Sequence, residues 1–342
     1  MQKIIKCNFI DKLIYFQKGG DASLEVKNKG YYWWYIDGLF PSKDGIIAIS
    51  FHISNKSMMS FSRKINPAYK LTIAKISNLE NVNSVEIITN KKQILKENFQ
   101  ASENEITFKD GYIKNSDNKF VLSLNDPELK LSIPLEYPNY LSPKALFFNR
   151  IYLQQIQYAA GNKAELNKLI INQLNIKRNA IGTGYIENVF GNAPCFFALK
   201  EWMWLRADLG DANIVIAIAK TNLFCAFKQI SMLHLHHKNG QSFSSQNTIE
   251  INNYKDIVIN IPDLKIKLTI NKFFKFQDYS PYKRLNSFFG RILDKLFSGR
   301  CIRCAISLDG TMELKGKKYN FNNKLGMFEI RSFYGYDASL YR

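Results

Sequence analysis

The chain has 342 residues, a length typical of two domains, and its hydrophobic content of 46% supports a large core and argues against bulk disorder. Forty-seven lysines and arginines outnumber 29 aspartates and glutamates, which gives a formal net charge of +18 and a positive surface potential. This charge suits an anionic membrane or an acidic ligand. The basic residues are scattered and form no nucleic-acid-binding motif, so we expect no nucleic-acid partner.

The first twenty residues, MQKIIKCNFIDKLIYFQKGG, contain neither an uninterrupted apolar run nor a small-residue cleavage site, which argues against a signal peptide. No later window reaches about 18 uncharged apolar residues, so no segment is predicted to span a membrane. The five cysteines are too few and too sparse for a disulfide framework, which favours reduced thiols. We expect a cytoplasmic protein, with a peripheral position at the inner membrane face as the alternative.

Alternation of apolar and polar residues dominates the chain. LKLSIPL (129–135) and LKIKLTI (264–270) each place their apolar side chains on one face, as half-buried antiparallel strands do. Asx-Gly pairs, which favour tight turns, stand at 37–38, 44–45, 110–111, 239–240 and 309–310. Many short strands with turns predict an all-β fold, and the length favours two barrels. We place the boundary after residue 226, which gives domains 1–226 and 227–342.

The first aromatic segment is YYWWYIDG, residues 31–38. On a strand, Trp33 and Tyr35 would face one way and Trp34 and Ile36 the other. So many rings can either fill a core or form the wall of a ligand pocket. The simpler interpretation is core packing followed by a turn at Asp37-Gly38, because aromatic side chains are commonly buried.

Two segments predict helices. NKAELNKLIINQL (162–174) lies within the break at 144–178 and begins at a plausible N-cap residue, Asn162. RLNSFFGRILDKLF (284–297) repeats apolar residues every three or four positions with basic residues beside them, although Gly290 lowers the helix propensity by about 1 kcal/mol. Besides packing on a barrel, this basic helix could contact an anionic membrane or cover a cavity as a lid.

GYIENVFG (184–191) is an apolar segment with a carboxylate, Glu187, and an amide, Asn188, at its centre. A carboxylic acid in apolar surroundings can donate a proton near neutral pH, as the protonation of an alkene requires. In EWMWLRADLGD (201–211), a strand would place Trp202, Trp204 and Arg206 on one face, where a cation above an indole gains about 0.5–2 kcal/mol. The alternative is a structural ion pair between Glu187 and Arg206.

Two further patterns are weak signals for a metal. His234 and His236 would point to one side of a strand, but no acid or cysteine nearby in the sequence completes a site. Cys301 and Cys304 form a single CxxC motif without a second pair. Phosphate-binding glycine loops, G-x-S-x-G and H-E-x-x-H are absent from the sequence. We therefore predict neither a metal nor a cofactor.

Four of these segments, in this order, resemble the two-domain lipocalin-like family of carotenoid 1,2-hydratases (hydroxyneurosporene synthases), AttH-type proteins and fungal decalin-forming Diels–Alderases. WWYIDG is similar to an early Trp-Trp-Tyr-aromatic-x-Gly strand, and GYIENVFG to the central Gly-Tyr-His-Asp-x-Asn-Trp/Phe-Gly motif. WMWLRADLGD (202–211) is similar to Trp-x-Trp-x-Arg-Ala-x-Leu of the hydratases, and SPYKRLNSFFG (280–290) to a Tyr-x-Arg segment. The likeness covers about residues 30–330.

The chain departs from that pattern at several positions. Ile186 and Asn188 stand where the family commonly has histidine, and Phe190 replaces the usual tryptophan. The strand NIVIAIAKT (213–221) lacks the tyrosine and aspartate of the hydratases. Hydration needs both a proton donor and a base, and the chain keeps at most one of them by position. Cyclisation and pericyclic closure tolerate that loss better, because a cavity that folds the substrate supplies much of the rate.

The resemblance implies two lipocalin-like (calycin-type) antiparallel β-barrels with a few short helices, and a hydrophobic cavity for an isoprenoid- or polyene-like molecule. It implies that Glu187 is the acid and that Asn188 and Arg206 orient or polarise the substrate. The pocket would be shaped by Trp33, Tyr35, Tyr185, Phe190, Trp202 and Trp204. The alternative is a non-catalytic protein that binds a lipid or pigment at a membrane surface, which explains the charge without catalysis.

Overall fold

The computed structural model describes residues 31–55, 66–101, 105–116, 119–126, 129–136, 144–148, 151–171, 176–191, 195, 199–222, 229–246, 249–252, 254–282 and 288–333. Strands account for 76% and helices for 6%, which confirms the predicted all-β class. The opening stretch 1–20, Cys7 and Cys225 lie outside these residues, as does the side chain of Phe190. Within them, no helix has the length and apolar character that crossing a bilayer requires.

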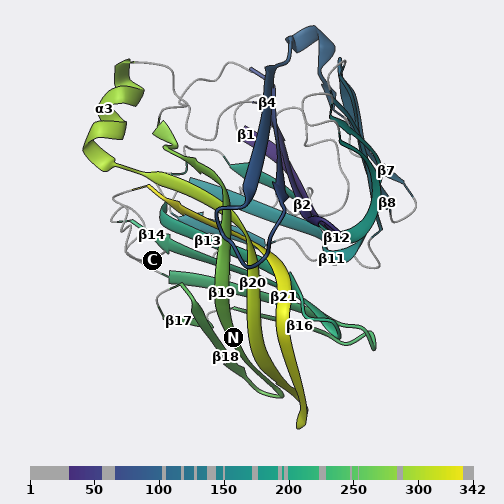
Figure 1. Cartoon of the computed structure of the whole chain (residues 1–342). Helices are drawn as coiled ribbons and strands as arrows, with labels where there is room; N and C mark the ends of the chain where they lie inside the picture. Colours follow the sequence, from purple (N-terminus) through teal and green to yellow (C-terminus); the bar gives the residue numbers. More distant parts are fainter. Residues whose placement is uncertain are drawn as a thin grey trace.

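The first antiparallel sheet has twelve strands in the order β4-β3-β2-β1-β12-β11-β9-β8-β7-β6-β5, with β10 paired to β11 (Figure 1). These strands are β1 (Tyr31–Ser42), β2 (Gly45–Ser54), β3 (Ala68–Ile76), β4 (Val85–Gln93), β5 (Gln100–Ala101), β6 (Glu105–Phe108), β7 (Gly111–Ser116), β8 (Lys119–Asn125), β9 (Leu129–Glu136), β10 (Lys144–Phe148), β11 (Ile151–Ile171) and β12 (Ile176–Gly191). A short 3₁₀ helix, η2 (Lys96–Asn98), precedes β5.

The second antiparallel sheet has nine strands in the order β16-β15-β14-β13-β21-β20-β19-β18-β17. These strands are β13 (Leu199–Asp208), β14 (Ala212–Thr221), β15 (Gln229–His237), β16 (Ser242–Gln246), β17 (Ile249–Asn252), β18 (Asp256–Ile261), β19 (Leu264–Tyr279), β20 (Arg300–Leu314) and β21 (Lys317–Ser332). Helix α3 (Phe288–Phe297) lies between β19 and β20 and stands at one end of the molecule.

Both sheets curl into half-barrels, as the predicted lipocalin-like fold requires. In the first sheet, the rings of Phe51 on β2 and Phe108 on β6 stack 6.2 Å apart, although these strands are far apart in the sheet order. In the second, Leu235 on β15 and Ile259 on β18 belong to one buried cluster. Each concave interior is therefore packed with apolar side chains, which supply the main hydrophobic stabilisation.

A third cluster joins the two sheets through their other faces. Tyr35 and Tyr185 of the first sheet contact Trp204 of the second, with ring centroids 5.9 Å and 4.7 Å apart. Side chains alternate along β1, so Trp34 points into the first core while Tyr35 points toward the second sheet. The predicted alternation of YYWWYIDG is thereby confirmed, and its two faces serve two different clusters.

The change of sheet falls between the end of β12 at Gly191 and the start of β13 at Leu199. β13 and β14 pair within the second sheet, although the boundary predicted after residue 226 places them with the first domain. The division into 1–226 and 227–342 stays a prediction about folding units, and it does not coincide with the change of sheet.

The predicted helix at 162–174 is wrong. Residues 162–171 belong to β11, which pairs with β12 on one side and β9 on the other, and residues 172–174 lie outside the described residues. Register shifts in β11 displace its buried positions from a strict period of two and produce spacings that resemble a helix. Pairing with two neighbouring strands overrides the local helix propensity.

The predictions for the other helix and the turns fare better. α3 confirms the helix predicted at 284–297 over residues 288–297. Turns at Asp44-Gly45, Asp110-Gly111 and Asn239-Gly240 are confirmed. Asp37-Gly38 and Asp309-Gly310 instead lie within β1 and β20, so the predicted turns there are wrong.

Candidate functional site

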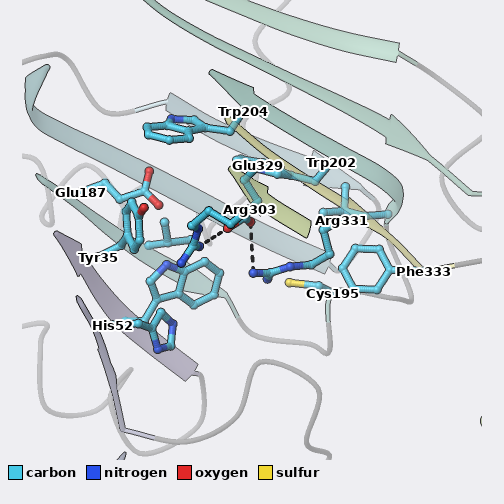
Figure 2. Close-up of a pocket in the computed structure, with 13 residues that line it drawn as sticks. Tyr35, His52, Glu187, Cys195, Trp202, Trp204, Arg303, Glu329, Arg331 and Phe333 are labelled. Atoms are coloured by element: carbon cyan, nitrogen blue, oxygen red, sulfur yellow. Dashed lines mark hydrogen bonds and ion pairs between the residues drawn. The ribbon is translucent and has the colours of Figure 1, made fainter. Parts of the chain in front are cut away.

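A pocket lies between the two sheets and is lined by side chains of both (Figure 2). It is lined by Trp33, Tyr35, His52, Glu187, Val189, Cys195, Leu199, Trp202, Trp204, Arg303, Glu329, Arg331 and Phe333. The cavity has a volume of about 40 Å³. The pocket is therefore narrow in this conformation.

Glu187 lies on β12, opposite Tyr35 in the register with β1, and is 8% exposed. The hydroxyl of Tyr185, two residues earlier on the same face, donates to its Oε2 at 2.6 Å. Burial, and next the Glu187 carboxylate, raise the pKa of Tyr185 well above its ordinary value. Tyr185 therefore stays protonated and holds the carboxylate in place as a donor.

The glycines that bound GYIENVFG allow close packing around this strand. A Cβ on Gly184 would come within 2.0 Å of the Leu135 side chain, and one on Gly191 within 2.1 Å of the Tyr31 hydroxyl. The Tyr31 hydroxyl in turn forms a hydrogen bond with the thiol of Cys195, 2.9 Å away. Close packing therefore explains why both positions are glycine, without any role in catalysis.

The opposite wall carries an arginine–glutamate–arginine cluster from β20 and β21. Glu329 forms ion pairs with Arg303 through Oε2 and, at 3.1 Å, with Arg331 through Oε1. Arg303 also donates to Ser50 Oγ at 2.6 Å and to Gln277 Oε1 at 3.2 Å. Ser50 belongs to the first sheet, so this cluster contacts both sheets. Figure 2 shows the cluster across the pocket from Glu187.

Burial and charge act in opposite directions on Arg303. Burial alone would lower the pKa of its guanidinium, but the Glu329 carboxylate and the Tyr35 ring raise that pKa above the ordinary value. The guanidinium lies 4.5 Å from the centroid of the Tyr35 ring, a cation–π contact. Arg303 is thus permanently charged.

Two acids and two arginines line the pocket, so their formal charges cancel when both acids are ionised. The sequence predicted a barrel cavity with one acid. This candidate pocket instead lies between the sheets, and its wall contains a second acid, Glu329. A neutral but strongly polar wall facing tryptophan rings can orient a mostly apolar ligand that carries one oxygen function.

Two buried donors of the wall are poorly satisfied among the described residues. The Tyr35 hydroxyl has no hydrogen-bond partner of good geometry among them. The Trp204 indole N–H likewise lacks one. Such groups cost stability unless a water or a ligand oxygen accepts from them.

The structure brings most of the predicted residues together. Trp33, Tyr35, Trp202, Trp204 and Glu187 line the pocket, and Tyr185 supports Glu187. Asn188 does not line it, since its side-chain amide donates to the backbone oxygen of Trp33 at 3.2 Å. Its contact is structural, joining β12 to β1.

Arg206 is not in the pocket, and the suggested ion pair with Glu187 is wrong. Its guanidinium pairs with Asp37, with both side chains fully buried, and donates to Thr183 Oγ1 at 3.1 Å. Arg206 shares the face of Trp204, as predicted, but lies two residues further along β13, beyond the pocket. The cation–π contact of the pocket comes from Arg303.

Sequence reasoning missed His52, Arg303, Glu329 and Arg331. A signal was available in MFEIRS (327–332), where Glu329 and Arg331 interrupt an apolar strand on one face. Arg303 interrupts the apolar strand CIRCAIS (301–307) in the same way. Charges on buried strands need partners, so these positions pointed to a buried polar cluster.

The histidines and the CxxC motif form no site. His236 Nδ1 shares a hydrogen bond with Ser242 Oγ at 2.9 Å. Cys301 and Cys304 are buried free thiols, and their odd separation on β20 directs them to opposite faces. Over the described part of the chain, no three His, Cys, Asp or Glu side chains gather as metal ligands would.

No family model matches the chain, and no curated protein matches it in sequence. Solved structures do match. One, from Nitrosomonas europaea and assigned to AttH, gives a TM-score of 0.57 at 9% identity over 90% of this chain and 93% of that one. The chain has the fold of the AttH-type proteins.

Two further structures have this two-domain lipocalin-like fold. Kievitone hydratase from Nectria haematococca gives a TM-score of 0.53 at 10% identity, with 90% of each chain covered. CghA in complex with Sch210972 gives 0.56 at 8% identity, again over 90% of each chain. The fold expected from the four motifs is therefore confirmed, and at these identities the likeness concerns the fold alone.

Proposed function

We propose that this AttH-fold protein is a hydratase- or cyclase-type enzyme that acts on a lipophilic small molecule in the pocket between its sheets. One observation carries the proposal: Glu187 faces the Arg303–Glu329–Arg331 cluster across a pocket walled by tryptophans. Kievitone hydratase, by its name a hydratase, and CghA, solved with Sch210972, have the same fold. This is support by analogy of fold, so the chemistry is argued from the pocket.

Glu187 in its protonated form is the proposed proton donor, and the Tyr185 hydroxyl stabilises the carboxylate that remains after the transfer. A proton delivered to an alkene or carbonyl generates positive charge on the substrate, which the faces of Trp33, Trp202 and Trp204 stabilise. A guanidinium of the opposite cluster would polarise a substrate oxygen, and such fixed charges act strongly where water is excluded.

Hydration needs in addition a base that activates water. His52 is the proposed base, because it lines the pocket beside Trp33, with ring centroids 5.8 Å apart, and imidazole accepts a proton near neutral pH. Cyclisation needs no such base, so the role of His52 separates the two reactions. A His52→Gln variant that keeps full turnover would favour cyclisation.

The narrow pocket limits the ligand. A cavity of about 40 Å³ holds roughly three waters and is far too small for a polyene. We therefore expect Trp33 and Trp202, which are partly exposed at the wall, to move when the ligand enters. A ligand that binds by such rearrangement should associate more slowly than diffusion allows.

A second candidate is a non-catalytic lipid- or pigment-binding protein. The ion pairs of Glu329 favour it, since this carboxylate is held by two arginines and has little freedom to transfer protons. In that case the pocket would recognise a ligand oxygen without changing it.

The test begins with native mass spectrometry and extraction of the lipophile that co-purifies with the protein. The isolated compound is then incubated with wild type, with Glu187→Gln and with a matched control, Glu250→Gln, an exposed acid on β17. Enzymatic function predicts turnover that Glu187→Gln lowers by about 10²–10⁴-fold and that the control leaves unchanged. A ligand that binds but is never converted would support the binding protein.

A further inference from the structure

Helix α3 turns apolar side chains outward. Phe288 is 74% exposed, Leu296 69% and Ile292 37%, and these residues are spaced four apart along the helix. Residues at this spacing lie above one another on a helix surface. α3 therefore carries an exposed apolar ridge, defined by these three side chains, on an element that projects from the sheets (Figure 1).

Basic side chains border the apolar ridge on one side. At about 100° per residue, Arg291 and Lys295 lie about 60° and 20° from Phe288 in one direction, while Ile292 and Leu296 lie about 40° and 80° in the other. Both basic residues are exposed. The outer surface thus places cations beside apolar groups, as helices that lie in a membrane interface do.

The single acid of α3 is turned away from this surface. Asp294 accepts a hydrogen bond from Ser280 and is only partly exposed. Leu293 is buried at 6%, and the Phe297 ring lies 5.9 Å from that of Tyr282. The inner face of α3 is therefore occupied by the protein, and its outer surface carries positive charge only.

The inner face of α3 packs on the wall of the pocket. Leu293 belongs to the same buried cluster as Cys195, Leu199 and Phe333, which line the pocket. The hydroxyl of Tyr282, beside α3, donates to the backbone oxygen of Phe333 at 2.6 Å. A surface on which α3 rests would therefore lie close to this wall of the pocket.

We propose that α3 docks the protein on an anionic lipid bilayer, with the apolar ridge below the headgroups and Arg291 and Lys295 on lipid phosphates, so that the pocket receives its ligand from the bilayer. The net charge of +18 favours the same partner. The docking stands on α3 alone, whereas the delivery of a ligand rests on the proposed function.

Co-sedimentation with vesicles tests the docking. Wild type is expected to bind vesicles of phosphatidylcholine and phosphatidylserine, and to bind phosphatidylcholine alone weakly. Changing Arg291→Gln and Lys295→Gln together should weaken binding to the anionic vesicles about 30-fold, with little effect on neutral vesicles. Changing Phe288→Ser and Leu296→Ser together should weaken binding to both about 100-fold.

Matched controls come from the first sheet region, near η2 and β6. Leu95 is 62% exposed near η2, so Leu95→Ser removes a comparable apolar group, and Lys109→Gln removes an exposed cation. Neither should change vesicle binding. Equal binding by all variants, or no binding to anionic vesicles at low salt, would overturn the docking. The docking would also be overturned if analytical ultracentrifugation found a dimer of the wild type that the Phe288→Ser and Leu296→Ser double variant dissociates.

Ligand delivery is tested by presenting the co-purified lipophile either in detergent or within vesicles. The apolar-ridge variant should convert the detergent-solubilised compound at the wild-type rate and the vesicle-embedded compound more slowly. Loss of vesicle binding with turnover unaffected in both forms would overturn delivery but not the proposed function. If Glu187→Gln kept its turnover, Glu187 would not be the acid, but the docking of α3 would be unaffected.

Discussion

Asp37 and Arg206 form an ion pair in which neither side chain has exposed area, and it joins β1 of the first sheet to β13 of the second. Arg206 Nε donates to Asp37 Oδ1 at 2.6 Å, and Nη1 donates to Thr183 on β12. The aspartate of WWYIDG and the arginine of WMWLRADLGD therefore hold the two sheets together. Their place in the motifs reflects architecture and not direct chemistry.

Arg206→Met should lower the free energy of unfolding by about 3–5 kcal/mol, because it leaves the Asp37 carboxylate buried without its partner. Adding Asp37→Leu should restore part of the loss, since the double variant buries no unpaired charge. Denaturation by urea measures both. Lys75→Met, which breaks the exposed pair with Glu86, is the control and should cost under about 1 kcal/mol. Lost turnover at unchanged stability would instead put Arg206 in the site.

Glu329→Gln should also destabilise the fold by about 3–5 kcal/mol, because two buried guanidiniums lose their shared carboxylate. It removes one negative charge from the pocket, so the anionic apolar probe anilinonaphthalene sulfonate should bind more tightly. Fluorescence titration measures the affinity. Glu313→Gln on β20, whose pair with Lys265 is exposed, serves as the control. Weaker probe binding in Glu329→Gln would contradict this charge balance.

Tyr185→Phe should lower kcat with little change in KM, because it removes the donor that holds Glu187 and leaves the shape of the pocket. The expected loss is about 10-fold, in line with one hydrogen bond to a charged group of about 1.5 kcal/mol. Tyr69→Phe removes a hydrogen bond to Asp110 within the first sheet and should leave kcat unchanged. Equal loss in both variants would indicate a general structural effect.

Cys195 should be unreactive in the folded protein. Burial raises the pKa of its thiol from 9.0 to about 11, so iodoacetamide at pH 8 should label it far more slowly than a free thiol. The folded state binds this proton more tightly than the unfolded state. The resulting stability is fully present below pH 9 and is lost as the pH rises toward 11.

Comparing unfolding of wild type and Cys195→Ala between pH 8 and 11 isolates this contribution. The difference in stability should shrink by about 2–3 kcal/mol across that range. Fast labelling at pH 8, or a constant difference, would show that Cys195 is more accessible than its 3% exposure indicates.

The fold was largely readable because antiparallel strands have a local signature. LKIKLTI alternates buried and exposed residues along β19, as its sequence predicts. The sequence wrongly predicted a helix within β11 because the bulges of this strand break the period of two. The position of a bulge is set by the neighbouring strand rather than by local sequence. The turn predicted at Asp37-Gly38 was wrong for a related reason, since Arg206, which is distant in the sequence, holds Asp37 inside a strand.

The sequence predicted only those pocket residues that lie on the first sheet and on β13, because the aromatic residues and Glu187 cluster there in the sequence. Arg303 and Glu329 approach Glu187 only because the second sheet packs on the first, and no local pattern encodes that contact. The choice of Arg206 as a site residue shows the same limit. Its face on β13 was predicted correctly, but its position along the strand decides that it meets Asp37 and not Glu187.

The central claim is that Glu187 delivers a proton to a lipophile held between the sheets. The most direct measurement is mass spectrometry of the co-purified lipophile after incubation in deuterated water with wild type and with Glu187→Gln. The account predicts that wild type incorporates solvent deuterium into a product that is either hydrated or isomeric, and that Glu187→Gln does so at least about 100-fold more slowly. Equal incorporation by both proteins would contradict it.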